Sequence, residues 1–172
     1  INVTASDFRR GSFAEMVLGR LAAKDVPPSC LQIEVTETVF LGRGAGYVEE
    51  ALRRLSEHGI RIALDDFGTG YASLSHLNQF PVDLLKIDRS FISKIGTSPD
   101  AEAISATVIN LGHCLGMEVI AEGIETGAQE AHLATVGCDT GQGFLYSEAL
   151  PAEDIPHILR QQDAPPAARQ SA

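Results

Sequence analysis

Residues 63–70 read Ala-Leu-Asp-Asp-Phe-Gly-Thr-Gly, an apolar run that ends in two adjacent carboxylates and a glycine-rich turn. Neighbouring acidic side chains repel each other and lose hydration when they are partly buried. A protein therefore tolerates Asp65 and Asp66 at a strand end only with a compensating charge, usually one or two divalent cations. Oxygen ligands of this kind indicate Mg²⁺ or Mn²⁺, and chemistry on a phosphate or a carboxylate.

The composition indicates one globular unit, with 172 residues, 44% hydrophobic and 21% charged. That length supports one good core rather than two domains. The net charge of −10 disfavours DNA binding, although cations held by acidic residues could still receive a phosphate ligand. Three cysteines without metal or disulfide-framework spacing favour reduced thiols and a cytoplasmic location. No apolar run approaches the roughly 18 residues of a membrane segment, so none is expected.

Short apolar runs alternate with helical patterns along the chain. Capping boxes are predicted at Ser12 with Glu15 and at Thr126 with Gln129, and Ser98 is predicted to begin another helix. Strands are predicted at Ile1–Thr4, Leu31–Val35, Ile60–Leu64, Leu84–Ile87, Val119–Ala121 and Gly143–Tyr146.

The alternation predicts a parallel sheet, in either a doubly wound fold or a barrel. Polar residues recur at the predicted strand ends, and a barrel brings such ends to one mouth. We therefore predict an α/β fold, a TIM-type (β/α)₈ barrel truncated here to about six βα units and lacking the N-terminal two. The partial domain is expected over residues 1–160, with a disordered tail over residues 161–172. The strand-end residues are Asn2, Glu34, Asp65, Asp66, Lys86, Glu122 and Gln142.

Seven segments form an ordered series over most of the chain. They are residues 2–4 (Asn-Val-Thr), 34–38 (Glu-Val-Thr-Glu-Thr), 65–71 (Asp-Asp-Phe-Gly-Thr-Gly-Tyr), 80–83 (Phe-Pro-Val-Asp), 85–91 (Leu-Lys-Ile-Asp-Arg-Ser-Phe), 121–126 (Ala-Glu-Gly-Ile-Glu-Thr) and 142–147 (Gln-Gly-Phe-Leu-Tyr-Ser). Together they resemble the EAL-domain family of cyclic di-GMP phosphodiesterases. The resemblance implies hydrolysis of cyclic di-GMP to linear pGpG at a centre with two Mg²⁺ or Mn²⁺ ions, in bacterial signalling.

The resemblance also implies a ligand set for the two cations. Asn2, Glu34 and Asp65 would hold the first cation, and Asp65 would bridge to the second. Asp66 and Glu122 would help to hold that second cation. Adjacent aspartates on a strand point to opposite sides unless the backbone bends, and we expect the following glycines to permit the bend.

Four further residues would assist this centre. Lys86 either reaches solvent or lies among carboxylates, and the resemblance favours a role in orienting or activating the attacking water. Gln142 would position water or an oxygen at the metal, or is simply a polar rim residue. Glu37 would hold the loop after Asp66. Glu125 is a weaker supporting residue, because a helix start also favours acidic side chains.

Residues 68–81 resemble a loop and the start of a dimerisation helix, so a homodimer is expected. In that loop Tyr71 and Phe80 could pack on a guanine or simply on the barrel. The family's Glu-Ala-Leu signature and a phosphate-contacting arginine would lie upstream of Asn2, and the sequence at 148–150 matches the signature by coincidence. A sensor or GGDEF-type cyclase domain could also lie upstream, and without the signature we expect weak metal binding.

Two other functions are alternatives to the phosphodiesterase. The first is a non-catalytic EAL-type receptor or interaction module, which would bind cyclic di-GMP or a protein without turnover. The second is a barrel lyase or aldolase that forms a Schiff base at Lys86, which the acidic cluster fits poorly.

Overall fold

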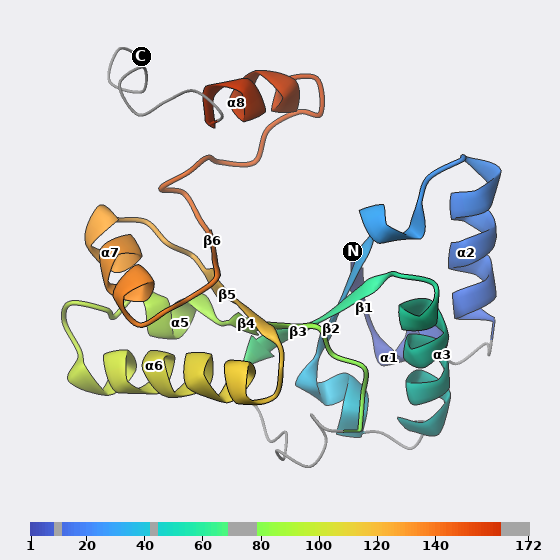
Figure 1. The fold of residues 1–172 in the computed structure, drawn as a ribbon, viewed down its shortest axis with the longest axis horizontal. Helices are drawn as coiled ribbons and strands as arrows, with labels where there is room; N and C mark the ends of the chain where they lie inside the picture. The colour runs from blue at the N-terminus through green and yellow to red at the C-terminus, as the bar shows by residue number, and fades with distance from the viewer. Residues whose placement is uncertain (9–11, 42–44, 69–78, 163–172) are drawn as a thin grey trace.

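The computed structural model describes residues 1–8, 12–41, 45–68 and 79–162, in which strands and helices alternate (Figure 1). The elements are β1 (Asn2–Val3), α1 (Ala5–Phe8), α2 (Phe13–Ala23), η1 (Pro28–Cys30), β2 (Gln32–Thr36), η2 (Glu37–Leu41), α3 (Ala45–Glu57), β3 (Arg61–Phe67), β4 (Leu84–Ile87), α5 (Arg89–Ile92), α6 (Pro99–Cys114), β5 (Glu118–Glu122), α7 (Gly127–Thr135), β6 (Thr140–Gln142) and α8 (Ile155–Gln162). The two η elements are 3₁₀ helices.

The six strands form one sheet in the order β1-β2-β3-β4-β5-β6, and every neighbouring pair is parallel. A doubly wound sheet reverses its strand order at a switch point, whereas successive βα units of a barrel add strands in chain order. The observed order confirms the prediction of six consecutive barrel units. The sheet is open, with β1 and β6 at its edges.

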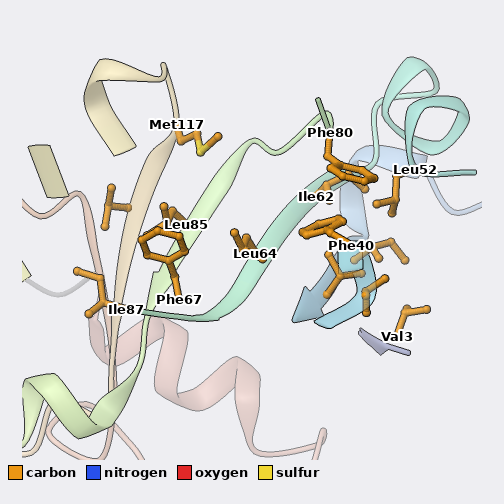
Figure 2. Packing of buried hydrophobic residues seen from close by; sticks show 14 of the residues in the cluster. Val3, Phe40, Leu52, Ile62, Leu64, Phe67, Phe80, Leu85, Ile87 and Met117 are labelled. Atoms are coloured by element: carbon orange, nitrogen blue, oxygen red, sulfur yellow. The ribbon is translucent and has the colours of Figure 1, made fainter. Parts of the chain in front are cut away.

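The core lies on the sheet face that the helices cover, which we call the outer face. Alternate strand residues point to it, including Ile62 and Leu64 of β3 and Leu85 and Ile87 of β4, all fully buried. These side chains pack with the helices in one large cluster (Figure 2). Helices α3 and α6 contact the sheet directly, and α2 packs on α3.

The opposite face, which we call the inner face, is built differently. Three buried residues, Ala63, Leu84 and Ile120, form a small separate apolar cluster there. Nearer the amino ends of the strands, Arg61 pairs with Glu118. Towards the carboxyl ends the alternate positions are charged, and these positions form the site described below.

Two predicted helix starts are confirmed. The Thr126 hydroxyl accepts from the Gln129 N–H, and the Gln129 side chain accepts from the Thr126 N–H, which completes the capping box of α7. The Ser98 hydroxyl accepts from the Ala101 N–H at the start of α6.

The capping box predicted at Ser12 is wrong. Ser12 precedes α2 with φ −123° and ψ 15°, and its side chain makes no capping hydrogen bond. Glu15, the other half of the predicted box, instead forms an ion pair with Arg54 of α3. A contact between helices has replaced the local interaction that the sequence suggested.

The sixth predicted strand is also wrong, because residues 143–146 form a turn and β6 ends at Gln142. The Ile124 N–H donates to the Gln142 carbonyl, and the Ile124 carbonyl accepts from the Leu145 N–H, both at 3.0 Å. A Cβ on Gly143 would lie 2.1 Å from the Ile124 oxygen, so the backbones touch where the strand stops. This contact between distant segments sets the end of β6.

Helix α8 extends to Gln162, two residues into the stretch predicted as a tail, and residues 163–172 lie outside the described part of the chain. Most of the loop predicted over residues 68–81, including Tyr71, also lies outside it. Among the described helices, none has both the length and the apolar character to cross a bilayer.

Candidate metal centre

Four neighbouring strands place charged side chains on the inner face. Glu34 belongs to β2, Asp65 to β3, Lys86 to β4 and Glu122 to β5. They occupy the alternate positions that do not enter the outer core. Because the carboxyl ends of parallel strands lie at the same edge of a sheet, the four side chains converge.

The ammonium group of Lys86 lies among these carboxylates. Its Nζ is 2.6 Å from Glu122 Oε1, 2.9 Å from Glu34 Oε2 and 3.1 Å from Asp65 Oδ1, and its side chain is only 5% exposed. Burial lowers the pKa of Lys86, but the hydrogen bonds to Glu122 and Glu34 outweigh it and raise the pKa above its ordinary value. Lys86 is therefore a buried cation, and the alternative in which it reaches solvent is wrong.

The bend that brings Asp66 to the site lies at Asp66 itself. Its φ is +55°, in the left-handed region that non-glycine residues rarely adopt, and the β3–β4 register shifts between Leu64 and Phe67. Its N–H donates to Asp65 Oδ1 at 3.1 Å. We expected the following glycines to supply the bend; Gly68 does have φ +95°, but the turn begins two residues earlier.

The carboxyl groups of the site differ in their proton affinity. Burial raises the pKa of Asp66, and nearby aspartates add to the effect. Burial also raises the pKa of Glu122, by more than the hydrogen bond from Lys86 lowers it. Burial would raise the pKa of Glu34, but the hydrogen bond and charge of Lys86, together with a hydrogen bond from Gln32 and the charge of the N-terminus, lower it. Glu34, Asp65, Asp66 and Glu122 share a single ammonium group, that of Lys86. The site therefore carries an excess of negative charge.

These residues fit a divalent cation. Asp65, Asp66 and Glu122 each offer one carboxylate oxygen, and the three oxygens lie within 4.8 Å of one another. An all-oxygen, acidic donor set suits Mg²⁺ or Mn²⁺ rather than softer metals. A divalent cation would also offset the negative charge that Lys86 leaves uncompensated.

The edge strands contribute Asn2 and Gln142. In the strand register Asn2 lies opposite Glu34, and Gln142 lies opposite Glu122. Both side chains are exposed. Paired positions of parallel strands share a sheet face, so the structure brings both predicted residues to the rim of the group.

Two predicted supporting residues lie outside the cluster. Glu37 begins η2, is 4% exposed, and accepts from the Gly68 N–H at 3.0 Å, two residues after Asp66. Glu125 is exposed just before the start of α7, where its N–H donates to Gln129 Oε1. The contact of Glu37 agrees with a supporting role, whereas the position of Glu125 agrees with an ordinary helix-start acid.

Sequence reasoning assigned no role to Asp88. Its carboxylate accepts from the Ser90 N–H at 3.0 Å and so caps α5. It also lies close enough to Asp66 to raise the pKa of that group by its charge and a hydrogen bond. The sequence signal that could have identified Asp88 is its position two residues after Lys86, directly after the end of β4.

Comparison with known proteins gives consistent matches. The family model described as EAL domain matches residues 1–149. The bifunctional diguanylate cyclase/cyclic di-GMP phosphodiesterase MucR of Pseudomonas aeruginosa is 39% identical over 155 residues, which is 90% of this chain and 22% of MucR. The chain spans about a fifth of the length of the first curated relatives it matches.

Two solved structures show the same architecture. The PaMucR phosphodiesterase in complex with c-di-GMP superposes with a TM-score of 0.83 at 39% identity, over 90% of this chain and 62% of that chain. Klebsiella pneumoniae BlrP1, in a complex with manganese and cyclic di-GMP, superposes with a TM-score of 0.78 at 34% identity, over 86% of this chain and 38% of that chain.

Proposed function

The chain belongs to the EAL domain family, and from that premise we propose that the protein hydrolyses cyclic di-GMP to linear pGpG with two Mg²⁺ or Mn²⁺ ions. The observation that carries the proposal is the convergence of Glu34, Asp65 and Glu122 on Lys86, with Asp66 beside them. The names of the similar proteins, which include a cyclic di-GMP phosphodiesterase and a manganese complex, support the choice of substrate and metal.

We assign the cation ligands as the family resemblance implies. Asn2, Glu34 and Asp65 would hold one cation, and Asp66 and Glu122 would hold the other, with Asp65 shared. Bound divalent cations supply charge that offsets the phosphodiester and lowers the pKa of a water molecule. The chain itself supplies a fixed set of oxygens, because Asp66 is held by the backbone bend described above.

Lys86 is best suited to orienting the attacking water and the phosphate. Its raised pKa keeps it protonated, so it donates hydrogen bonds and does not act as a general base. The same charge argues against a Schiff base, since only a neutral amine attacks a carbonyl. We propose that Gln142, exposed beside Glu122, assists in placing the water.

The partners of the proposed enzyme follow the same family reasoning. We propose a homodimer formed through the segment after Asp66, and a cytoplasmic enzyme that acts on a soluble nucleotide. The name of MucR includes a diguanylate cyclase, which supports the proposal of a GGDEF-type domain in the same polypeptide as this EAL domain. Cross-linking and size-exclusion chromatography of the full-length protein would test the dimer.

Hydrolysis by the full-length protein tests the proposal directly. With Mn²⁺ present, cyclic di-GMP should be converted to pGpG, and Asp65→Asn should lower kcat by about a thousandfold or more, because several kcal/mol of charge stabilisation are lost. Asp100→Asn is the matched control, since Asp100 is exposed in the first turn of α6, and it should leave kcat unchanged.

The outcome also separates the two main hypotheses. Turnover that survives Asp65→Asn would overturn the metal mechanism. Calorimetric binding of cyclic di-GMP without any turnover by the unaltered protein would instead identify a receptor. The chromatographic appearance of pGpG is the deciding measurement.

A further inference from the structure

The 3₁₀ helix η2 contacts two segments next to the metal centre, one directly after β3 and one before β4. Its first residue, Glu37, accepts from the Gly68 N–H, which follows β3 directly. Its fourth residue, Phe40, stacks on Phe80, which precedes β4, with ring centroids 4.1 Å apart and an interplanar angle of 34°. One short helix thus contacts the residue that follows the strand carrying Asp65 and a residue that precedes the strand carrying Lys86.

The contact between the two rings is well buried. Phe40 is 4% exposed and Phe80 7% exposed. Figure 2 shows the two rings stacked beside Leu52 and Ile62. The rings therefore anchor η2 to the outer core, and neither ring can move far without disturbing its neighbours.

The geometry of a 3₁₀ helix joins these two contacts mechanically. With three residues per turn, side chains at positions i and i+3 lie on the same side. Glu37 and Phe40 are such a pair, so a rotation or shift of η2 that disturbs Phe40 also displaces the Glu37 carboxylate. A displaced Glu37 carboxylate would in turn change its hydrogen bond from the Gly68 N–H, two residues after Asp66.

We propose that Phe40 is a positioning residue of the metal centre, acting through Glu37 and Gly68 on the backbone of Asp66. The proposal rests on the function proposed above, since it concerns the same ligands. Metal ligands must be held within about half an ångström of their working positions, so a small shift of η2 is sufficient to weaken the site.

A matched pair of variants in the full-length protein tests the role of Phe40. Phe40→Leu removes one ring of the stack, and Phe13→Leu removes one ring of the buried Phe8–Phe13 pair, whose centroids are 4.9 Å apart. Both variants should lose stability. Because a buried aromatic pair is worth a modest amount beyond its area, Phe40→Leu should raise the Kd for Mn²⁺ about two- to tenfold, and Phe13→Leu should leave it unchanged.

Hydrogen exchange at the Gly68 amide gives a second readout that needs no metal. Phe40→Leu should accelerate deuterium uptake there about two- to tenfold at a temperature where both variants are folded, and Phe13→Leu should not. In a double-mutant cycle, Phe40→Leu and Phe80→Leu should be non-additive in their effect on this exchange, because they break the same stack.

The results distinguish this inference from the proposed function. Equal Mn²⁺ affinity and equal Gly68 exchange in the Phe40 and Phe13 variants would overturn the positioning role, even if the protein hydrolyses cyclic di-GMP. Faster Gly68 exchange in Phe40→Leu alone would support it, even if the unaltered protein shows no turnover. If Mn²⁺ does not bind at all, the proposed metal mechanism fails and the exchange rate alone decides the positioning role.

Discussion

Leu85 and Lys86 are neighbours in β4, but they point to opposite faces of the sheet and have different surroundings. Leu85 is fully buried in the outer core, whereas Lys86 is buried among three carboxylates on the inner face. The same alternation separates core positions from the proposed ligand positions on the neighbouring strands. Stability and chemistry are therefore assigned to different side chains of the same strands.

The inner face itself changes along the strands. At the amino ends Arg61 and Glu118 form a half-exposed ion pair, and the small cluster of Ala63, Leu84 and Ile120 lies in the middle. The group around Lys86 lies at the carboxyl ends. This order agrees with the rule that barrel enzymes place chemistry at the carboxyl ends of their strands and structural contacts at the other end.

The largest expected effects come from replacing Leu85 and Lys86, the two neighbours in β4, one at a time. Leu85→Ala should lower the free energy of unfolding by about 2–5 kcal/mol, from lost burial and a cavity. Lys86→Met should lower it by about 3–5 kcal/mol in metal-free protein, because the carboxylates lose their cation. Urea denaturation with and without Mn²⁺ measures both losses, and Mn²⁺ should restore more stability to Lys86→Met than to Leu85→Ala. Equal restoration would contradict the separation of the two faces.

A second test uses pH in the metal-free protein. The pKa values of Asp66 and Glu122 are raised, so the folded chain binds more protons than the unfolded chain, and protonating these groups favours folding. Their contribution to the free energy of unfolding should therefore increase as the pH falls from 7 towards the ordinary values of 3.8 and 4.5. Below that window Glu34, with its lowered pKa, should act in the opposite direction.

Mn²⁺ affinity should fall over the same pH range in which these two groups add stability, because carboxylate ligands must lose their protons to bind. Parallel denaturation and Mn²⁺ calorimetry between pH 7 and about pH 4.5 would record both trends. A stability that decreases together with the Mn²⁺ affinity would show that other ionisable groups, and not Asp66 and Glu122, dominate the pH dependence of folding.

A smaller effect is expected on the helices of the outer face. Thr126→Ala should lower the free energy of unfolding by about 1 kcal/mol, since Thr126 caps α7. Ser12→Ala should have almost no effect, because the Ser12 side chain makes no cap. Thermal denaturation distinguishes the two, and Mn²⁺ affinity should be the same in both variants.

The smallest effect is expected at the amino end of the inner face. Arg61→Met should lower the free energy of unfolding by at most about 1 kcal/mol, as for other exposed ion pairs. Mn²⁺ affinity and hydrolysis should not change. A clear loss of affinity would show that the two ends of the inner face are coupled.

Much of this architecture is predictable because it depends on local patterns. Alternating strands and helices indicated the parallel sheet, and the capping box at Thr126 is complete within four residues. The acidic pair and the lysine at strand ends indicated one site, since a barrel brings such ends together.

The missed features depend on contacts between distant segments. The end of β6 is set by Ile124, and the ring that supports η2 belongs to Phe80, forty residues after its partner along the chain. The left-handed backbone of Asp66 is likewise hard to predict, because positive φ is uncommon at non-glycine residues even though Asp is enriched among them.

The conformation of Asp66 also has an evolutionary consequence. The backbone there would favour Gly or Asn, which adopt φ near +55° at lower cost, while the proposed metal site requires a carboxylate. A descendant released from selection for catalysis would gain stability by replacing this one residue, and would keep its outer core. In a lineage that has become a receptor, we therefore expect the acid at this position to be among the first residues replaced.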